Sequence, residues 1–248
     1  CIGCGNCVRV CSQKAKNVLS SVGLTRELLA GNAPVAACIA PSFPAEFVEA
    51  KPERVIGALR QLGFDYVHEV AFGADLVARE YRRLIEKSPS GRHIASTCPA
   101  IVAYVERYHP DLVDRLAPIV SPMVALARYL KQQGPPGLKI IFIGPCIAKK
   151  GEAASAQIEG EIDAVLTFSE LRGFISAEGI DLDGTAPGEF DPPAAGYGAL
   201  FAISRGLLQA ANIHEDLVNG DVVAAEGRTD FVEAIKEFET GDLDAKLL

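Results

Sequence analysis

Lys139-Ile140-Ile141-Phe142-Ile143-Gly144-Pro145-Cys146 indicates the fold more clearly than any other part of the sequence. Residues 139–143 form a short apolar run, which is typical of a strand buried on both faces. Gly144 and Pro145 end the run, so that Cys146 follows directly after the predicted strand. A strand of this kind favours a parallel sheet that is covered by helices.

Further strands and helices are predicted on both sides of this strand. Strands are expected at residues 35–40, 66–72, 93–97, 163–167 and 222–225. Helices are expected at residues 24–32, 54–62, 74–86, 100–109, 122–133, 169–177 and 231–238. This alternation predicts an α/β fold with largely parallel sheets flanked by helices.

The composition narrows the classes of protein to consider. The chain has 248 residues, of which 49% are hydrophobic, so a sizeable core is expected. The net charge is −8 and the 24 Lys and Arg residues are scattered, so we expect no nucleic-acid partner. No apolar run approaches the roughly 20 residues of a membrane helix, and no signal peptide precedes the first cysteine. We therefore expect a cytoplasmic protein without a membrane partner.

Four cysteines at the start of the chain have the spacing of an iron–sulfur motif, Cys1-x2-Cys4-x2-Cys7-x3-Cys11. Gly3 and Gly5 allow the tight backbone that brings successive thiolates to one cluster. A zinc site is less well supported, because such sites favour paired cysteines some distance apart. We predict that residues 1–20 are a partial ferredoxin-like [4Fe–4S] segment, in which Cys11 serves a neighbouring cluster.

Three further features each follow a predicted strand: Pro41-Ser42, Cys98-Pro99 and Pro145-Cys146. In open α/β sheets, ligands bind in the crevice outside the carboxyl ends of the strands. Cys98 and Cys146 therefore form a candidate second metal site. The alternative stays open at this point, because an isolated buried cysteine is often a small core residue.

Short motifs occur in a fixed order along the whole chain. They are Ala40-Pro41-Ser42, Leu59-Arg60-Gln61-Leu62-Gly63-Phe64-Asp65, Phe72-Gly73-Ala74-Asp75-Leu76, Thr97-Cys98-Pro99, Ser121-Pro122, Pro145-Cys146-Ile147-Ala148-Lys149-Lys150-Gly151-Glu152, Asp163-Ala164-Val165-Leu166-Thr167 and Glu170-Leu171. Together they resemble the catalytic domain of [FeFe]-hydrogenases, preceded by its last ferredoxin-like motif. By this resemblance, residues 33–248 are a hydrogenase-like domain that stops before the third cysteine motif of the family.

The resemblance implies an H-cluster, in which a [4Fe–4S] unit is joined to a two-iron subcluster that carries CO and cyanide. Cys98 and Cys146 match two of its four cysteine ligands. The residues that match the lining of the two-iron subcluster are Pro41, Ser42, Ser121, Pro122, Met123 and Lys149. The family uses the lysine to hold a cyanide ligand. An electron donor such as ferredoxin, and fused or partner signalling domains, are also implied.

The chain departs from the family at its proton relay. Thr97 stands where the family has a cysteine, Ala117 replaces a serine, and Glu80-Tyr81 replaces a pair of glutamates, whereas Glu152 is retained. A hydroxyl has a pKa far above that of a thiol, so it carries protons poorly near neutral pH. With Thr97, Lys149 and Glu152 as the catalytic candidates, we expect slow proton/H2 chemistry with a sensory role. The alternative is a non-catalytic [4Fe–4S] module for electron transfer or redox signalling.

Overall fold

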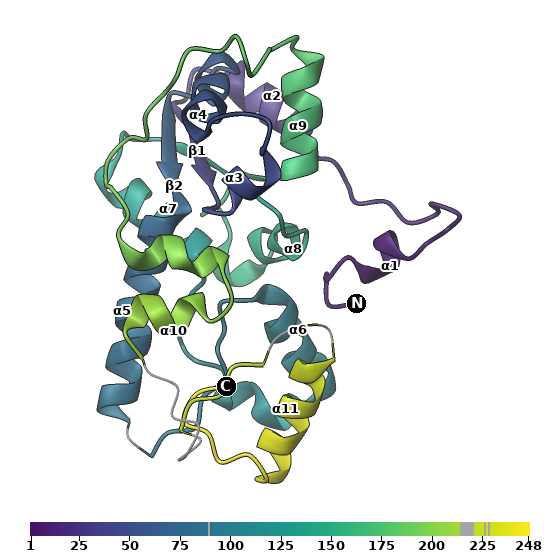
Figure 1. Ribbon diagram of the computed structural model, residues 1–248, viewed down its shortest axis with the longest axis vertical. Helices are drawn as coiled ribbons and strands as arrows, with labels where there is room; N and C mark the ends of the chain where they lie inside the picture. The colour runs from purple at the N-terminus through teal and green to yellow at the C-terminus, as the bar shows by residue number, and fades with distance from the viewer. Residues whose placement is uncertain (89, 214–220, 226, 228) are drawn as a thin grey trace.

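The computed structural model describes residues 1–248 except 89, 214–220, 226 and 228 (Figure 1). Its sheet has four strands, β1 (Val35–Ile39), β2 (Tyr66–Glu69), β3 (Lys139–Gly144) and β4 (Ala164–Thr167), in the order β2-β1-β3-β4. Every pair of neighbouring strands is parallel. The predicted α/β class with a parallel sheet flanked by helices is therefore confirmed.

The two central strands explain why the sheet forms. All five residues of β1 are buried, and β3 is buried from Ile140 to Gly144. Helices cover such strands on both faces, so the strands are apolar throughout instead of alternating. Helices α2 (Val22–Leu29), α4 (Pro52–Gln61), α7 (Pro122–Gln133) and α9 (Phe168–Ala177) share one hydrophobic core with the sheet.

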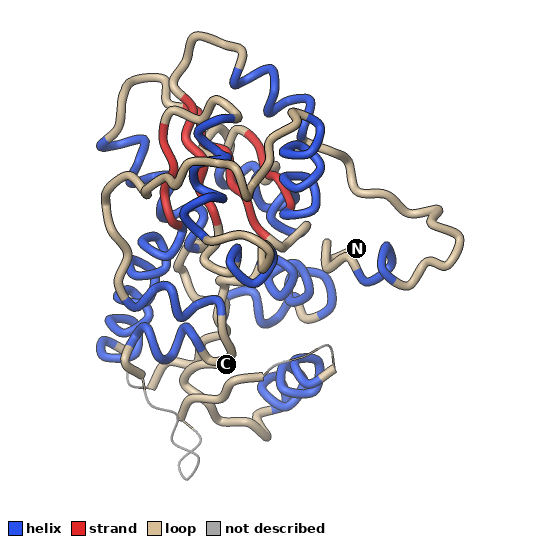
Figure 2. The backbone as a smooth tube through the Cα atoms, turned by 45° about the horizontal axis from the view of Figure 1, so that its top comes forward, coloured by secondary structure: helices blue, strands red, loops and turns tan. Residues whose placement is uncertain are grey.

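The other end of the molecule is built from helices and loops (Figure 2). It contains most of the long helix α5 (Val70–Lys87), with α6 (Pro99–Tyr108), α10 (Gly206–Ala211) and α11 (Asp230–Thr240). Short 3-10 helices lie at Pro110–Arg115, Ala156–Ile158 and Tyr197–Ala202. Two small hydrophobic clusters, around Tyr81 and around Phe238, form its core. None of the helices described is long and apolar enough to cross a membrane.

The predicted strands at 93–97 and 222–225 are wrong. Residues 93 and 94 form only isolated bridges with Leu247 and Leu116, and Val222 forms one with Leu247. The backbone is extended there, since His93 and Ala95 donate to the carbonyls of Lys246 and Leu248. Residues count as a strand only where consecutive bridges form a ladder, and these extended segments form single bridges.

The predicted strand at 66–72 is too long, because β2 ends at Glu69 and α5 begins at Val70. The first turns of α5 are largely buried, so residues 70–72 are apolar. An apolar run of this kind cannot be told from a buried strand by sequence alone. Val70, Ala74, Val77 and Tyr81 are buried at the spacing of one helix face. The other predicted helices agree with the structure to within a few residues at either end.

Two helical glycines should respond oppositely to alanine. At Gly73 in α5, a Cβ would lie 2.2 Å from the Pro122 carbonyl oxygen of α7, whereas at Gly173 in α9 nothing lies within 4 Å. We expect Gly73→Ala to destabilise the fold by about 1–3 kcal/mol through overpacking. Gly173→Ala should stabilise it by about 0.5–1 kcal/mol, because glycine is a poor helix former. Urea denaturation of both variants checks this, and a stabilised Gly73→Ala would contradict the close packing of α5 on α7.

Candidate metal centre

The carboxyl edge of the sheet brings two of the predicted site segments together. Ile39 and Ile143 are partners in the β1–β3 ladder, and the Ala40 amide donates to the Ile143 carbonyl at 2.8 Å. Pro41-Ser42 and Pro145-Cys146 therefore leave the sheet side by side. Ser42 then becomes the N-cap residue of the short helix α3 (Phe43–Glu46).

Gly144 allows this close approach of the two strands. A Cβ at this position would lie 2.7 Å from the Phe142 ring and 3.2 Å from the Ala40 Cβ. A larger side chain at this position would not fit without displacing β1 or the Phe142 side chain.

Cys146 is followed by a turn that leads into the short helix α8 (Ala148–Ala153). The Lys149 amide donates to the Cys146 carbonyl at 3.3 Å. The Lys149 side chain is buried, and its Nζ lies 2.7 Å from Glu152 Oε2. Two residues predicted separately as catalytic thus form one ion pair. Because an ammonium group has three N–H donors, two remain after the contact with Glu152.

Cys98 is positioned differently, because no strand precedes it. It is the N-cap residue of α6 and is exposed. The segment before it is fixed by Ser96, whose amide donates to the Tyr81 hydroxyl at 2.8 Å and whose Oγ donates to the Ile119 carbonyl at 2.6 Å. Helix α6 packs against α8, which brings this segment toward the loop of Cys146.

Tyr81, at one of the altered relay positions, forms a closed hydrogen-bond chain with Ser96. The buried Tyr81 hydroxyl accepts from the Ser96 amide and donates to Ser96 Oγ at 3.1 Å, and Ser96 Oγ in turn donates to a backbone carbonyl. Ala117 is buried in the same apolar cluster as Tyr81. Burial raises the pKa of Tyr81 despite the Ser96 hydrogen bonds, so this hydroxyl stays protonated. This series of hydrogen bonds therefore ends at the Ile119 carbonyl, which cannot pass a proton on.

The cysteine-rich start of the chain lies against the beginning of α8 (Figure 1). Gly3 and Gly5 have positive φ angles of 71° and 76°. A Cβ on Gly3 would lie 3.2 Å from the Ala148 Cα, and one on Gly5 would lie 2.8 Å from Ile147 Cδ1. The two glycines are thus needed both for the turn and for the contact with the loop after Cys146.

Cys4 lies near both candidate ligand loops. It lines one cavity of about 450 Å³ together with Cys146, and another of about 450 Å³ together with Cys98. A third cavity of about 320 Å³, between α6 and α8, is lined by Cys1, Ser96 and Glu152 among others. The N-terminal segment therefore lies over the region between Cys98 and Cys146.

The donor set fits an iron–sulfur cluster in kind but is incomplete in number. All seven cysteines are free thiols, and the six predicted as ligands are exposed or half-buried. In the part of the chain that the structure describes, no group of three or more His, Cys, Asp or Glu side chains is arranged to hold a metal ion. The hydrogenase-like domain therefore offers two thiols to a cluster, those of Cys98 and Cys146.

The predicted lining residues of α7 differ in their surroundings. Ser121 Oγ is buried and has no hydrogen-bond partner among the described residues, which suits a group that contacts a bound ligand. Pro122 packs against Gly73 through its carbonyl oxygen. The Met123 side chain is only 1% exposed and belongs to the core of the sheet. The structure thus places Met123 among core side chains.

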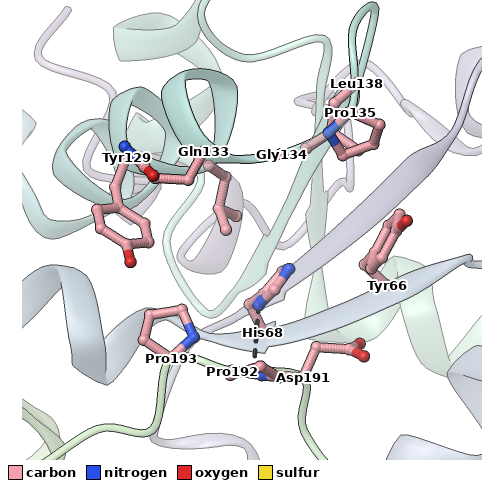
Figure 3. Close-up of a pocket in the computed structure, with 11 residues that line it drawn as sticks. Tyr66, His68, Tyr129, Gln133, Gly134, Pro135, Leu138, Asp191, Pro192 and Pro193 are labelled. Carbon is pink, nitrogen blue, oxygen red and sulfur yellow. Dashed lines mark hydrogen bonds between the residues drawn. The ribbon is translucent and has the colours of Figure 1, made fainter.

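A separate cavity of about 410 Å³ lies beside β2 (Figure 3). Its lining includes Tyr66, His68, Gln133 and Asp191 but no cysteine. Burial lowers the pKa of His68, so its ring is neutral, and its Nδ1 donates to the Asp191 carbonyl at 3.3 Å. This cavity shares no lining residue with the three cavities around Cys4 and Glu152.

Sequence comparison assigns the family. Residues 33–246 match the model of the iron only hydrogenase large subunit, C-terminal domain, and the chain belongs to this family. The predicted resemblance to [FeFe]-hydrogenases is thereby confirmed.

Individual relatives support the same assignment. The chain is 30% identical to Iron hydrogenase 1 of Clostridium pasteurianum, over 80% of this chain and 38% of that protein. It is 25% identical to the cytosolic Fe-S cluster assembly factor NAR1 of Yarrowia lipolytica, over 74% of this chain and 44% of that protein. The chain thus spans less than half the length of these curated relatives.

Solved structures show the same fold. The apo form of a variant [FeFe]-hydrogenase HydA1 from Chlamydomonas reinhardtii superposes with a TM-score of 0.68 at 27% identity. The superposition covers 78% of this chain and 57% of that one. The relatives of this chain thus include both hydrogenases and proteins named as assembly factors.

The hydrogen bonds of Tyr81 should contribute measurably to stability. We expect Tyr81→Phe to lower the free energy of unfolding by about 1–3 kcal/mol, because it leaves the Ser96 amide without its acceptor. Because the folded-state pKa of Tyr81 is raised, its contribution is complete below about pH 10 and is lost as the pH rises further.

Urea denaturation between pH 7 and 11 checks both statements. Tyr66→Phe, at the half-buried first residue of β2, is the control and should change stability by less than about 0.5 kcal/mol. Equal stability of Tyr81→Phe and the wild type would show that the closed hydrogen-bond chain is not formed.

Proposed function

We propose that this chain is the electron-receiving part of a slow [FeFe]-hydrogenase-like protein, with an H-cluster between the loops of Cys98 and Cys146. Residues 1–20 are its ferredoxin-like [4Fe–4S] segment and residues 33–248 its hydrogenase-like domain. The observation that carries this proposal is the contact of Gly3 and Gly5 with Ile147 and Ala148, beside Cys146. It supports the proposal because the predicted cluster segment then lies next to the loop of Cys146.

The chain's own residues would have distinct roles at this site. Cys98 and Cys146 would supply two thiolates, and Pro41, Ser42, Ser121 and Pro122 would line the site. The free donors of Lys149 and the Ser42 hydroxyl would hold the cyanide ligands. When bound, the H-cluster supplies the redox-active iron at which protons and electrons are interconverted with H2. The position of Met123 in the core argues for packing there and not for lining.

Proton supply would limit the rate. Thr97 stands next to Cys98 with a hydroxyl in place of a thiol, and the Tyr81 hydroxyl is committed to Ser96. Neither group exchanges protons readily near neutral pH. Glu152, which is bound to Lys149 and lines the cavity between α6 and α8, is the remaining acid–base group. Such a site suits the sensing of H2 or redox state better than high flux.

Electrons would enter through the N-terminal segment. Cys1, Cys4 and Cys7 would hold one [4Fe–4S] cluster, and Cys11 would belong to a neighbouring one. A ferredoxin-type protein is the expected electron partner. For a sensor, a fused or separate signalling domain would receive the change of redox state.

A second function is favoured by the same closed relay. A hydrogenase-like scaffold that binds only [4Fe–4S] clusters needs no path for protons. Tyr81 and Ala117 would then not impair its function. The similarity to the cytosolic Fe-S cluster assembly factor NAR1 supports this reading. It differs from the first in lacking CO and cyanide at the site.

Infrared spectroscopy separates the two functions. The full-length protein would be produced with the hydrogenase maturation factors. Its infrared spectrum would be recorded in the CO and cyanide stretching regions. We expect bands from both ligands in the wild type and their loss in Cys146→Ser. Cubane absorption without such bands after full maturation would contradict the H-cluster and favour the second function.

The replacement of a thiol by the Thr97 hydroxyl should account for most of the loss in the rate of proton transfer. We expect Thr97→Cys in the matured protein to raise H2 evolution at least about tenfold, because a positioned proton donor contributes ~10²–10⁴-fold. Thr97→Ser, which keeps a hydroxyl, is the control and should give no gain. Measurement of H2 with a chemical reductant checks this, and an unchanged rate in Thr97→Cys would overturn the relay account.

A further inference from the structure

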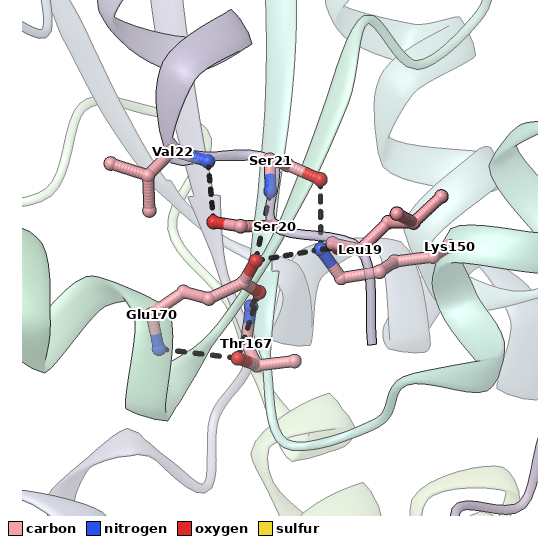
Figure 4. A network of polar contacts seen from close by, with 7 residues as sticks. All are labelled: Leu19, Ser20, Ser21, Val22, Lys150, Thr167 and Glu170. Atoms are coloured by element: carbon pink, nitrogen blue, oxygen red, sulfur yellow. Dashed lines mark hydrogen bonds and ion pairs between the residues drawn. The ribbon is translucent and has the colours of Figure 1, made fainter. Parts of the chain in front are cut away.

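Lys150 binds the linker that follows the cysteine-rich segment (Figure 4). Its Nζ donates to the Leu19 carbonyl at 3.0 Å, to Ser21 Oγ at 2.8 Å and to Glu170 Oε1 at 2.9 Å. These contacts use all three donors of the ammonium group. Lys150 is therefore not a solvated surface lysine but is committed to residues about 130 positions earlier in the chain.

Glu170 binds the same linker from the other side. Its Oε1 accepts from the Ser21 amide at 2.9 Å, and its Oε2 accepts from the amide and hydroxyl of Thr167 at 2.7 and 2.8 Å. Thr167 and Glu170 also form the capping box of α9. Burial alone would raise the pKa of Glu170, but the hydrogen bonds from Thr167, Lys150 and Ser21 lower it, so the carboxylate is ionised. We call Lys150, Glu170 and Thr167, with Leu19 and Ser21, the linker anchor.

Both ends of the linker meet the same short helix. Before the linker, Gly3 lies close to Ala148 and Gly5 lies close to Ile147; at the end of the linker, Leu19 and Ser21 contact Lys150. Residues 12–17 between these contacts are exposed and belong to no helix or strand. In Figure 1 this linker extends away from the body of the molecule and returns to it. Helix α8, which begins two residues after Cys146, is thus the common support of the segment and its linker.

We propose that Lys150 and Glu170 are positioning residues that hold the N-terminal cluster segment in register with Cys98 and Cys146. This inference rests on the proposed function, since it concerns electron transfer between the two predicted clusters. The neighbours of Gly3 and Gly5 in this contact, Ala148 and Ile147, are apolar, so they give it no hydrogen-bond direction. The charged anchor, with both partners about 15% exposed, supplies directional contacts that restrict where the linker returns.

The test uses variants that remove one side of the anchor. Lys150→Met keeps the side-chain length and removes the donors, and Glu170→Gln removes the charge. Lys150→Arg restores a cation and should rescue the behaviour. Arg172→Met is the matched control, because Arg172 lies on the same helix α9 in an exposed ion pair with Glu49.

The first readout needs no metal. Hydrogen exchange of the full-length apo protein is followed by mass spectrometry in a peptide that covers residues 19–26. We expect at least tenfold faster exchange in Lys150→Met and Glu170→Gln, and a change below twofold in Lys150→Arg and Arg172→Met. Unchanged exchange in the first two variants would overturn the anchor.

The second readout reports on cluster geometry. The full-length protein is reconstituted with iron and sulfide, and electron paramagnetic resonance spectra of the reduced clusters are compared at equal iron content. We expect weaker magnetic interaction between the clusters in Lys150→Met and Glu170→Gln than in the wild type. Faster exchange with an unchanged interaction would overturn the positioning role. A wild type without any cluster signal would instead overturn the proposed function, while the exchange experiment still decides whether the anchor exists.

Discussion

The parallel pairing of β1 with β3 is the constraint on which the site depends. It continues one step past the ladder, where the Ala40 amide donates to the Ile143 carbonyl, and Gly144 permits this close approach. Two loops that are about one hundred residues apart in the sequence therefore leave the sheet together. The turn after Cys146 then begins α8, which contacts the cysteine-rich start of the chain and presents Lys149 to Glu152.

Local pattern predicted the sheet because its strands are short apolar runs with clear ends. The runs at 35–40 and 139–143 became β1 and β3, and Thr167 ends β4 close to the expected position. The run at 93–97 is extended as well, but its residues form only single bridges. Strand propensity could not reveal this, since it depends on the neighbouring strands and not on the segment alone. Similarly, the buried first turns of α5 concealed the end of β2 at Glu69.

The candidate site could be predicted only in part, for the same physical reason. Pro41-Ser42 and Pro145-Cys146 were expected together because parallel strands end at one edge. Contacts between distant residues had no local signal: Ser21 and Glu170 are 149 positions apart, and Tyr81 binds Ser96, which lies 15 positions later. Lys150 in particular has no local sequence signal that distinguishes it from a solvated surface lysine. Only the folded chain shows that it binds the linker and that Tyr81 closes the relay.

If Cys98 and Cys146 bind a cluster of their own beside the N-terminal one, removal of both thiols should remove the iron of that cluster alone. Iron and acid-labile sulfide are therefore measured in the reconstituted full-length protein and in its Cys98→Ser/Cys146→Ser variant. The account predicts that the variant loses the iron of one cluster and keeps the paramagnetic signal of the N-terminal cluster. An iron content equal to that of the wild type would contradict it.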